Sequence, residues 1–426
     1  MPGDALNESP HATMDKGRFS RTEGGPKSAG RLDNEHARAT RFGTGASTWA
    51  LLVTLLVHWL GRGVAKADDH VDYKYELYGE EANRITVHTH SALFEQKLAP
   101  GVALKGAFVY DGISGATPTG GPPPTGSSKV PTVEIDDTRR AGYLEPNFKF
   151  GHHTLAPQVA YSKEEDYESV GVSLNYLLDF NRRNTTLNLG VAHNFDRLTG
   201  FQLNMNNQWE KKNATDFLAG LTQVLTPATL FNATLTLGTA NGYLSDPYKG
   251  FRFTLYPDPT ALFPEKRPGH RTKQIVSTTL TQFVEPLDGT AELTYRFYHD
   301  SFELFGHTAT LEWLQSVGQH LTVAPFVRYY HQSEAYFYLL SFASDPTPPD
   351  PGFPPPPPIP QFYSADYRLS MFRSMTYGIS VTLELGQRFF FDAAYKRYDM
   401  RGLDGVTPQS SYATANIYTI GMRVHF

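Results

Sequence analysis

The last fifteen residues, 412–426, constrain the fold more strongly than any other stretch. Successive side chains of a β-strand point to opposite faces. On this reading Tyr418, Ile420, Met422, Val424 and Phe426 share one apolar face, and the opposite face is polar or small. A strand with one face in lipid and the other in a wet lumen needs this pattern. The closing strand of a soluble β-sandwich is the alternative, but the same alternation recurs along the chain and favours a barrel.

Composition agrees with a membrane barrel and argues against a helical membrane protein. Aromatic residues make up 13% of the chain, with 28 Phe and 24 Tyr, as expected if rings line two membrane interfaces. Hydrophobic residues reach only 40%, and the mean hydropathy is −0.39, too low for a bundle of spanning helices. A length of 426 residues usually suggests several domains, but large barrels of this size form one domain.

Several classes of function are disfavoured by the residues that are absent or scarce. The chain has no cysteine, which excludes disulfides, thiolate metal sites and cysteine nucleophiles. A net charge of −5 argues against a nucleic-acid partner. No serine nucleophile can be placed beside an ordered histidine and acid from the sequence alone. We therefore expect neither an enzyme nor a cofactor-binding protein.

The N-terminal part of the chain has the features of a targeting segment. Residues 1–46 are polar and predicted to be a disordered leader, and 47–67 contain a signal-peptide core with its cleavage region. The apolar run 49–60 is too short to span a bilayer, and 65–67 form a small-x-small cleavage site. An uncleaved anchor helix is the alternative. The mature barrel is expected to comprise 68–426, in the bacterial outer membrane after export through the inner membrane.

Period-two alternation predicts about sixteen strands, an even number as single-chain bacterial barrels require. The expected strands are 71–79, 84–95, 102–110, 138–150, 154–162, 169–180, 185–195, 212–225, 229–239, 271–284, 290–300, 302–316, 320–330, 367–385, 388–400 and 412–426.

The lengths of the connections give a second, independent indication of a barrel. Short turns fall one pair of strands apart, and the long loops all fall on the other side. The turns are near Leu98, His152, Arg182, Pro227, Pro286, Gly318 and Gly386, and the long loops are near Gly120, Pro257 and Pro355. We therefore predict an all-β, transmembrane, antiparallel up-and-down barrel with short periplasmic turns and long extracellular loops.

Five stretches of the chain resemble a known family of outer-membrane proteins, called domain of unknown function 3570. They are 110–120, 162–169, 241–249 with 265–271, 328–332 and 364–369. The resemblance covers roughly 68–426 and implies a membrane barrel, but little about its activity. Members are often encoded near a thioredoxin-like protein, a small lipoprotein and a flavin transferase. The resemblance thus hints at an extracytoplasmic redox or flavin system.

Two motifs in the expected loops are candidate binding elements. Asp111 and Ser114 belong to a Gly-rich motif that we expect to form a structured loop folding over the barrel mouth, with a ligand or cation site at Asp111 as the alternative. The same two interpretations apply to the second motif, which is rich in aromatic and charged residues. Its candidates are Tyr243, Asp246, Tyr248 and Lys249.

Two groups of potential metal ligands were considered, and no metal site is predicted. Glu164, Glu165 and Asp166 are expected at a solvated hairpin tip, with a site for a divalent ion or a lipopolysaccharide bridge as the alternative. His88 and His90 share one strand face and could reach a common metal. No third ligand stands at a useful spacing from them.

Charged residues are expected to line the lumen, and they leave two classes of function open. The candidates are Arg296, Arg328, Arg423, Glu292, Glu312 and Asp392. A wet, charged lumen favours a porin-like channel for small solutes. The alternative is a non-conducting barrel, plugged by its loops, that serves an envelope assembly and binds a periplasmic or lipoprotein partner. The other expected partners are outer-membrane lipid, lipopolysaccharide and the barrel assembly machinery.

The apolar face of the final strand leads to a prediction about assembly. Phe426→Ser should lower the amount of protein folded in the outer membrane and leave export to the periplasm intact, because the interrupted face should bind the assembly machinery less well. The measurement compares heat-modifiable barrel in outer-membrane fractions with total periplasmic protein. An unchanged outer-membrane yield would contradict the prediction.

Overall fold

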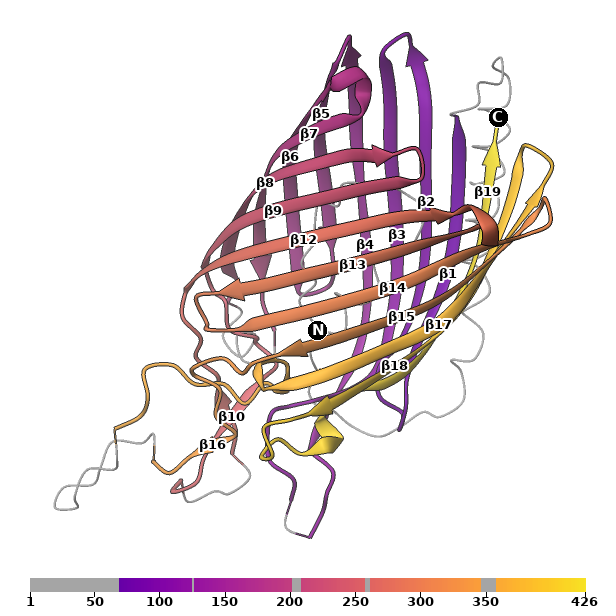
Figure 1. Ribbon diagram of the computed structural model, residues 1–426. Coiled ribbons are helices and arrows are strands. Elements are labelled where there is room, and N and C mark those ends of the chain that lie inside the picture. Colours follow the sequence, from indigo (N-terminus) through magenta and orange to yellow (C-terminus); the bar gives the residue numbers. More distant parts are fainter. Residues whose placement is uncertain (1–68, 125, 201–207, 257–260, 346–357) are drawn as a thin grey trace, which may run out of the picture.

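The computed structural model describes residues 69–124, 126–200, 208–256, 261–345 and 358–426. These residues form a closed antiparallel barrel of sixteen strands, which confirms the predicted fold (Figure 1). The predicted leader, 1–46, and the predicted signal segment, 47–67, lie outside the described residues. Within the described part of the chain, no helix is both long enough and apolar enough to cross a bilayer.

The barrel strands follow the sequence order around the ring, so neighbours in the chain are neighbours in the wall. Their bounds are β1 (His70–Glu80), β2 (Thr86–Ala99), β3 (Val102–Pro118), β4 (Thr132–Phe150), β5 (His153–Lys163), β6 (Tyr167–Phe180), β7 (Thr185–Leu198), β8 (Glu210–Thr226), β9 (Thr229–Gly242), β12 (His270–Val284), β13 (Gly289–Asp300), β14 (Phe305–Val317), β15 (Leu321–Gln332), β17 (Phe372–Leu385), β18 (Phe389–Gly402) and β19 (Thr414–His425).

The final strand closes the barrel by pairing with the first. β19 and β1 run antiparallel from the pair His70↔His425 to the pair Glu80↔Ala415. On the inner face of this seam, Arg423 donates two hydrogen bonds to Asp72, at 2.6 and 2.8 Å. The pattern that predicted a barrel strand therefore belongs to the strand that completes the ring of backbone hydrogen bonds.

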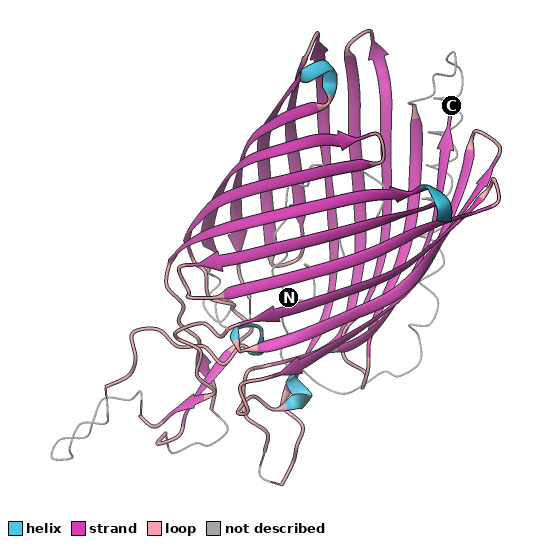
Figure 2. Cartoon of the chain, in the orientation of Figure 1, coloured by secondary structure: helices cyan, strands magenta, loops and turns pink. Residues whose placement is uncertain are grey.

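The connections divide between two ends of the barrel, as their lengths predicted (Figure 2). At one end, here called the turn end, each pair of strands is joined by a few residues or by a short 3-10 turn, such as η2 (Asn181–Arg183) and η3 (Glu285–Leu287). The long connections 119–131, 243–269, 333–371 and 403–413 all lie at the opposite end, here called the loop end.

Four predicted boundaries at the loop end were wrong. β3 continues to Pro118, and β4 begins at Thr132, so the Gly-rich motif expected in a loop lies within a strand. β2 pairs with this motif as far as Ser114, and β4 pairs with it as far as Pro118, so the ladder continues through the Gly-rich residues. β14 begins at Phe305, and β17 begins at Phe372 after the 3-10 turn η4 (Tyr367–Leu369).

The outer wall exposes a continuous belt of large apolar side chains. Among the most exposed are Leu189, Phe217, Leu235, Leu237, Leu293, Tyr295, Leu311, Tyr377, Ile379, Tyr418 and Ile420. Soluble monomers rarely expose apolar patches of such extent. Alternate residues of the same strands point inward and are mainly polar or small. This inside-out distribution is the one that a barrel wall in lipid requires.

A small second sheet lies outside the barrel wall at the loop end. β10 (Gly250–Phe253) pairs antiparallel with β11 (Phe263–Pro264) and parallel with β16 (Ser341–Phe342). Figure 1 shows β10 and β16 below the barrel, beside the ends of the strands. The sheet joins the two longest connections, so these loops are folded together.

The orientation of β9 leads to a prediction about the outer wall. Leu235, which is 41% exposed, faces outward, and its neighbour Thr234 faces inward between Gly220 and Ser277. Leu235→Arg should lower the free energy of unfolding in lipid vesicles by about 2–4 kcal/mol, because a guanidinium at mid-depth is poorly solvated. Thr234→Arg, the matched control, should change it much less. Equal losses in the two variants would contradict the assigned orientation of the strand.

Candidate functional site at the loop end of the barrel

The two longest connections build one structure over the barrel mouth. We call the described parts of 243–269 and 333–371 the loop cap. Besides sharing the small sheet, the two segments meet at the backbone bridge Lys266↔Tyr363. A second bridge, Tyr338↔Ser364, folds the later segment back on itself. The cap therefore has its own backbone framework.

Apolar side chains form two clusters within the loop cap. In the first, Phe251 and Phe253 pack with Ala365 and are almost completely buried. In the second, Phe337 and Leu369 pack against Phe302, which comes from the connection between β13 and β14. The second cluster thus fastens the cap to the rim of the barrel. Buried aromatic rings of this kind contribute strongly to the stability of a small folded unit.

A third cluster places part of the loop cap against the inner wall. Tyr367 of η4 is buried against Tyr78 of β1, Tyr398 of β18 and Ile417 of β19. These three wall residues point into the barrel at its loop end. The cap therefore enters the mouth and contacts the inside of the wall next to the closing seam.

Contacts of the loop cap cross the mouth from one side to the other. In the ring of sixteen strands, β9 stands eight places from β1, directly opposite. Lys249 follows β9 in the chain, and its Nζ lies 5.8 Å from the ring centroid of Tyr367, which packs on β1. The same Nζ donates a hydrogen bond of 2.6 Å to the carbonyl oxygen of Pro118, at the end of β3. The cap spans the opening and is anchored at several points of the rim.

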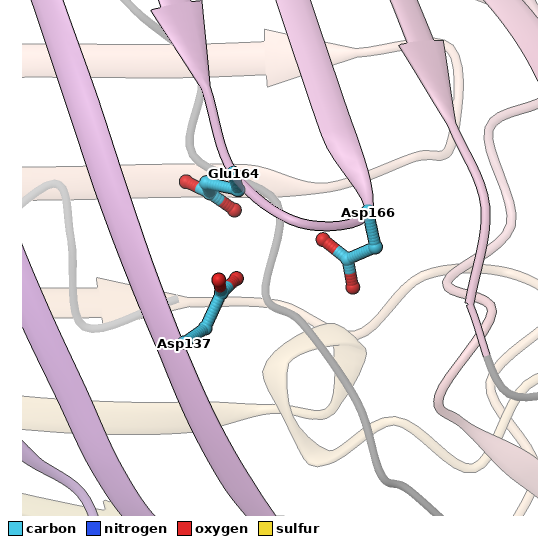
Figure 3. Close-up of side chains that lie close together, drawn as sticks. All are labelled: Asp137, Glu164 and Asp166. Carbon is cyan, nitrogen blue, oxygen red and sulfur yellow. The ribbon is translucent and has the colours of Figure 1, made fainter.

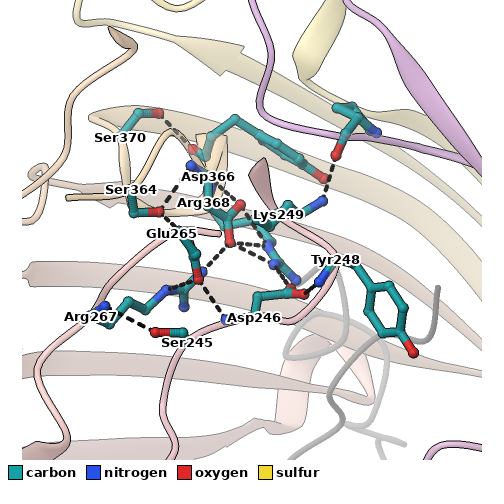
Figure 4. A network of polar contacts seen from close by, with 12 residues as sticks. Ser245, Asp246, Tyr248, Lys249, Glu265, Arg267, Ser364, Asp366, Arg368 and Ser370 are labelled. Atoms are coloured by element: carbon teal, nitrogen blue, oxygen red, sulfur yellow. Dashed lines mark hydrogen bonds and ion pairs between the residues drawn. The ribbon is translucent and has the colours of Figure 1, made fainter. Parts of the chain in front are cut away.

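A buried network of charged residues joins the two segments of the cap (Figure 4). Arg368 Nε donates hydrogen bonds of 2.8 and 2.9 Å to the two carboxylate oxygens of Asp366. The Nη2 of the same arginine lies 2.5 Å from an oxygen of Asp246, on the other segment. Bidentate arginine–carboxylate pairs fix geometry as well as supplying energy.

A second arginine links the same carboxylate to another acid. Arg267 donates a 2.7 Å hydrogen bond from Nη2 to Asp366, and its Nε lies 2.6 Å from Glu265. Glu265 also accepts a hydrogen bond from the backbone N–H of Asp246, at 2.5 Å, and one from the hydroxyl of Ser364. Every carboxylate of the network therefore has several donors.

With Lys249 counted, three basic residues face the three acids of this network, and the pKa values of two of the acids shift in opposite directions. Burial by itself would raise the pKa of Asp366, but Arg368, Arg267 and Lys249 hold that pKa well below its usual range. Burial raises the pKa of Glu265, and Arg267 only partly opposes this. Asp366 thus stays ionised in mild acid and supplies the central negative charge of the network.

Three carboxylates gather at the rim, one from β4 and two from the connection between β5 and β6 (Figure 3). One carboxylate oxygen each of Asp137, Glu164 and Asp166 lies within 4.8 Å of the other two. Three oxygens at this spacing could bind the same cation. Glu164 is buried, unlike the solvated hairpin tip that we expected. Asp166 accepts a hydrogen bond from Tyr248 of the loop cap, and Asp137 accepts one from the backbone N–H of Glu165. Asp166 therefore holds the cap to the rim, and Asp137 fixes the connection between β5 and β6.

The structure places one of the two candidate loop motifs in a strand and the other in the loop cap. Asp111 and Ser114 lie in β3, so the expected loop is wrong. Asp111 is buried on the inner wall and accepts hydrogen bonds from Thr89 and Arg139, both at 2.6 Å. Tyr243, Asp246, Tyr248 and Lys249 all belong to the connection that forms the cap. Asp366 and Arg368 were not selected from the sequence, because nothing local shows that they meet a motif about 120 residues away.

The candidate lumen residues all lie on inward strand faces. Arg328 and Glu312 are buried, and Arg423 pairs with Asp72. Asp392 accepts a hydrogen bond from Thr382, and Glu292 accepts one from Thr281; Arg296 stacks over Tyr298. Ion pairs between nearby strands follow the inner wall: Lys105–Glu95, Arg139–Asp111, Lys212–Asp196, Arg271–Asp300, Lys273–Asp216 and Arg423–Asp72. Much of the lumen charge is therefore paired.

His88 and His90 share a face, as predicted, but it is the outer face of β2. The register places them beside Leu77 and Tyr75 of β1. Nδ1 of His88 and Nδ1 of His90 lie 2.9 and 2.8 Å from the hydroxyls of Tyr75 and Tyr73. Neither imidazole belongs to a metal-ligand cluster among the described residues. They form part of an aromatic band instead.

A family model described as "Protein of unknown function (DUF3570)" matches residues 45–409. The chain belongs to this family. The match extends over most of the barrel, and confirms the resemblance drawn from the loop motifs. A search of curated proteins found no match to this DUF3570 chain.

Solved structures similar to this DUF3570 protein include proteins from three different bacteria. The siderophore receptor PirA from Pseudomonas aeruginosa is 8% identical with a TM-score of 0.40, over 84% of this chain and 62% of that one. CdiB from Acinetobacter baumannii is 8% identical, with a TM-score of 0.47, over 84% and 60%. A loop-deletion mutant of OmpT from Vibrio cholerae is 10% identical, with a TM-score of 0.42, over 84% and 98%. The chain spans less than two thirds of PirA and CdiB.

The buried network predicts how the loop cap responds to loss of its central charge. Asp366→Asn should loosen the cap, because breaking a buried ion pair costs about 3–5 kcal/mol. Limited trypsin digestion of the folded protein should cut within 249–271 at least about tenfold faster than in the native chain. Asp136→Asn, which removes an exposed acid at the same end of the barrel, is the control. Equal cleavage rates in the two variants would show that the network does not hold the cap.

Proposed function

We propose that the protein is an integral outer-membrane barrel that acts as a restricted, porin-like channel for small solutes. The apolar outer wall and the polar inner wall support insertion in a bilayer with a wet lumen. In this proposal the turn end faces the periplasm and the loop end faces the cell exterior. The loop cap narrows the outer opening.

The contact between Lys249 and Tyr367 is the observation that carries this proposal. It joins a loop that leaves β9 to a turn packed on β1, and these two strands stand opposite each other in the ring. Barrels of sixteen strands leave a wide aqueous channel unless something fills it. A cap in this position restricts passage to the space beside it, and favours small solutes over large ones.

Paired charges on the inner wall should give the channel only a weak ionic preference. Arg423 is matched by Asp72, and five further ion pairs line the same wall. A pair of opposite charges a few ångströms apart has little field beyond the Debye length, about 8 Å at physiological salt. The candidate arginines therefore provide structure to the wall as much as selectivity.

A non-conducting barrel in an envelope assembly is the second candidate, and the firm anchoring of the cap favours it. Four anchors have been described: the carbonyl of Pro118, the acid Asp166, the inner-wall residue Tyr78 and the rim residue Phe302. A cap fixed so thoroughly would suit a barrel that presents a folded surface to a partner. The periplasmic or lipoprotein partner expected from the sequence belongs to this candidate.

Conductance in planar bilayers tests the channel and separates the two candidates. The native protein should show small unit conductance, and Asp366→Asn should raise it at least about twofold by loosening the cap at the mouth. Asp136→Asn serves as the control and should conduct like the native protein. Absence of conductance in all three folded proteins would reject the channel and support the non-conducting barrel.

A further inference from the structure

A basic row crosses the outer wall at the loop end, where β15, β17 and β18 lie side by side (Figure 1). The strand registers pair His331 with Arg373, and Arg373 with Arg401. One step further from the rim, the same face carries Tyr329, Met375 and Asp399 in register. Both arginines are exposed on the outside of the barrel.

Next to the basic row, on the side away from the rim, lies a groove with an apolar floor. Its volume is about 340 Å³, within the usual range of ligand sites. The floor is formed by Tyr329, Met375 and Tyr377, whose side chains are 39%, 41% and 52% exposed. Arg373 and Arg401 lie at the edge of the groove nearest the rim. Ser374 and Asp399 complete the lining. The end of the groove nearest the rim is therefore cationic, and the floor is apolar apart from Asp399, which pairs with Arg401.

The two arginines at the cationic end are not fully neutralised by acidic residues. Among the described residues, Arg373 makes no hydrogen bond or ion pair within the chain. Arg401 lies 3.0 Å from Asp399, but its side chain is 60% exposed, and an ion pair so open to solvent is weak. Two arginines and one aspartate leave one positive charge at the edge of the apolar belt. An arginine at that level needs an anion or water to solvate it.

We propose that this groove binds a phosphorylated glycolipid of the outer leaflet, with a phosphate on Arg373 and Arg401 and an acyl chain on the apolar floor. The inference rests on the proposed membrane orientation, in which the loop end faces the cell exterior. Arginine pairs recognise phosphate through several parallel N–H donors. An aromatic and methionine floor packs well against lipid chains. The loop end of the wall stands at the level of the lipid headgroups of that leaflet.

The occupant differs from an ordinary annular lipid in what it requires. Lipids that merely surround a barrel need only the apolar belt, so their binding should not depend on two particular arginines. A soluble phosphate compound would use the arginines but not the floor. A phosphorylated glycolipid uses both, and the groove offers both within a few residues of three adjacent strands.

Native mass spectrometry of the folded protein in detergent, titrated with bisphosphorylated lipid A, tests this site. Arg373→Gln combined with Arg401→Gln should weaken binding about thirtyfold, because each arginine near an anionic lipid surface contributes about a factor of five. Arg182→Gln with Arg183→Gln, the same charge change at the turn end, should bind like the native protein. Lipid A stripped of its phosphates should bind the native protein about as weakly as the phosphorylated lipid binds the double variant.

Three results would overturn the site: equal affinity in the two double variants, undiminished binding of the dephosphorylated lipid, or displacement of lipid A by an equal concentration of glucosamine 1-phosphate, which lacks acyl chains. Heat-modifiable migration of each variant on gels shows that the barrel is folded. Arg373 and Arg401 both lie outside the lumen. Planar-bilayer conductance should therefore be the same in the native protein and in the variant with Arg373→Gln and Arg401→Gln. A failed channel measurement therefore leaves the lipid result interpretable, and the reverse also holds.

Discussion

In a hydrocarbon environment, every backbone N–H and C=O has to find its partner within the protein. The ring of sixteen strands meets this requirement only because β19 pairs with β1 along its whole length. Closure fixes the alternation of side chains on every strand, and so decides which residues face lipid and which face the lumen. The positions of Arg423 and Asp72 at the seam, and of the apolar belt outside, follow from that single condition.

The loop cap meets the same requirement by a different route. Its long segments leave the ladder, so their polar groups need other partners once they are packed over the mouth. Side chains supply many of these partners: Glu265 accepts from a backbone N–H, and Asp366 accepts from two arginines. A buried network of this kind specifies one arrangement, because any displaced member would leave a charge without compensation. The charged residues of the cap therefore act mainly as determinants of shape.

The sequence was sufficient for the barrel and insufficient for the cap. Each strand shows a local period of two, which can be recognised within a single segment such as 412–426. Repeating this along the chain gives the number of strands and the alternation of short and long connections. The motif at Asp111 was misplaced because Gly-rich segments usually mark the end of a strand, whereas here β2 pairs with it to Ser114 and β4 to Pro118. The hydrogen bonds of His88 and His90 to tyrosines of β1 could not be foreseen, because strand register is a non-local property. The meeting of Arg368 with Asp246 spans 122 residues, and no pattern in either segment indicates the other.

The attachment of the cap on opposite sides of the ring has a mechanical consequence. A closed sheet is a hoop that can flatten into an ellipse without breaking any ladder hydrogen bond. A cap attached at separate points of the rim, through Lys249 to β3, Tyr367 to β1 and Leu369 to Phe302, resists this flattening where it is attached. The turn end has only short links between adjacent strands, and no brace among the described residues. Shape fluctuations of the barrel should therefore be small at the braced rim and grow steadily toward the opposite one.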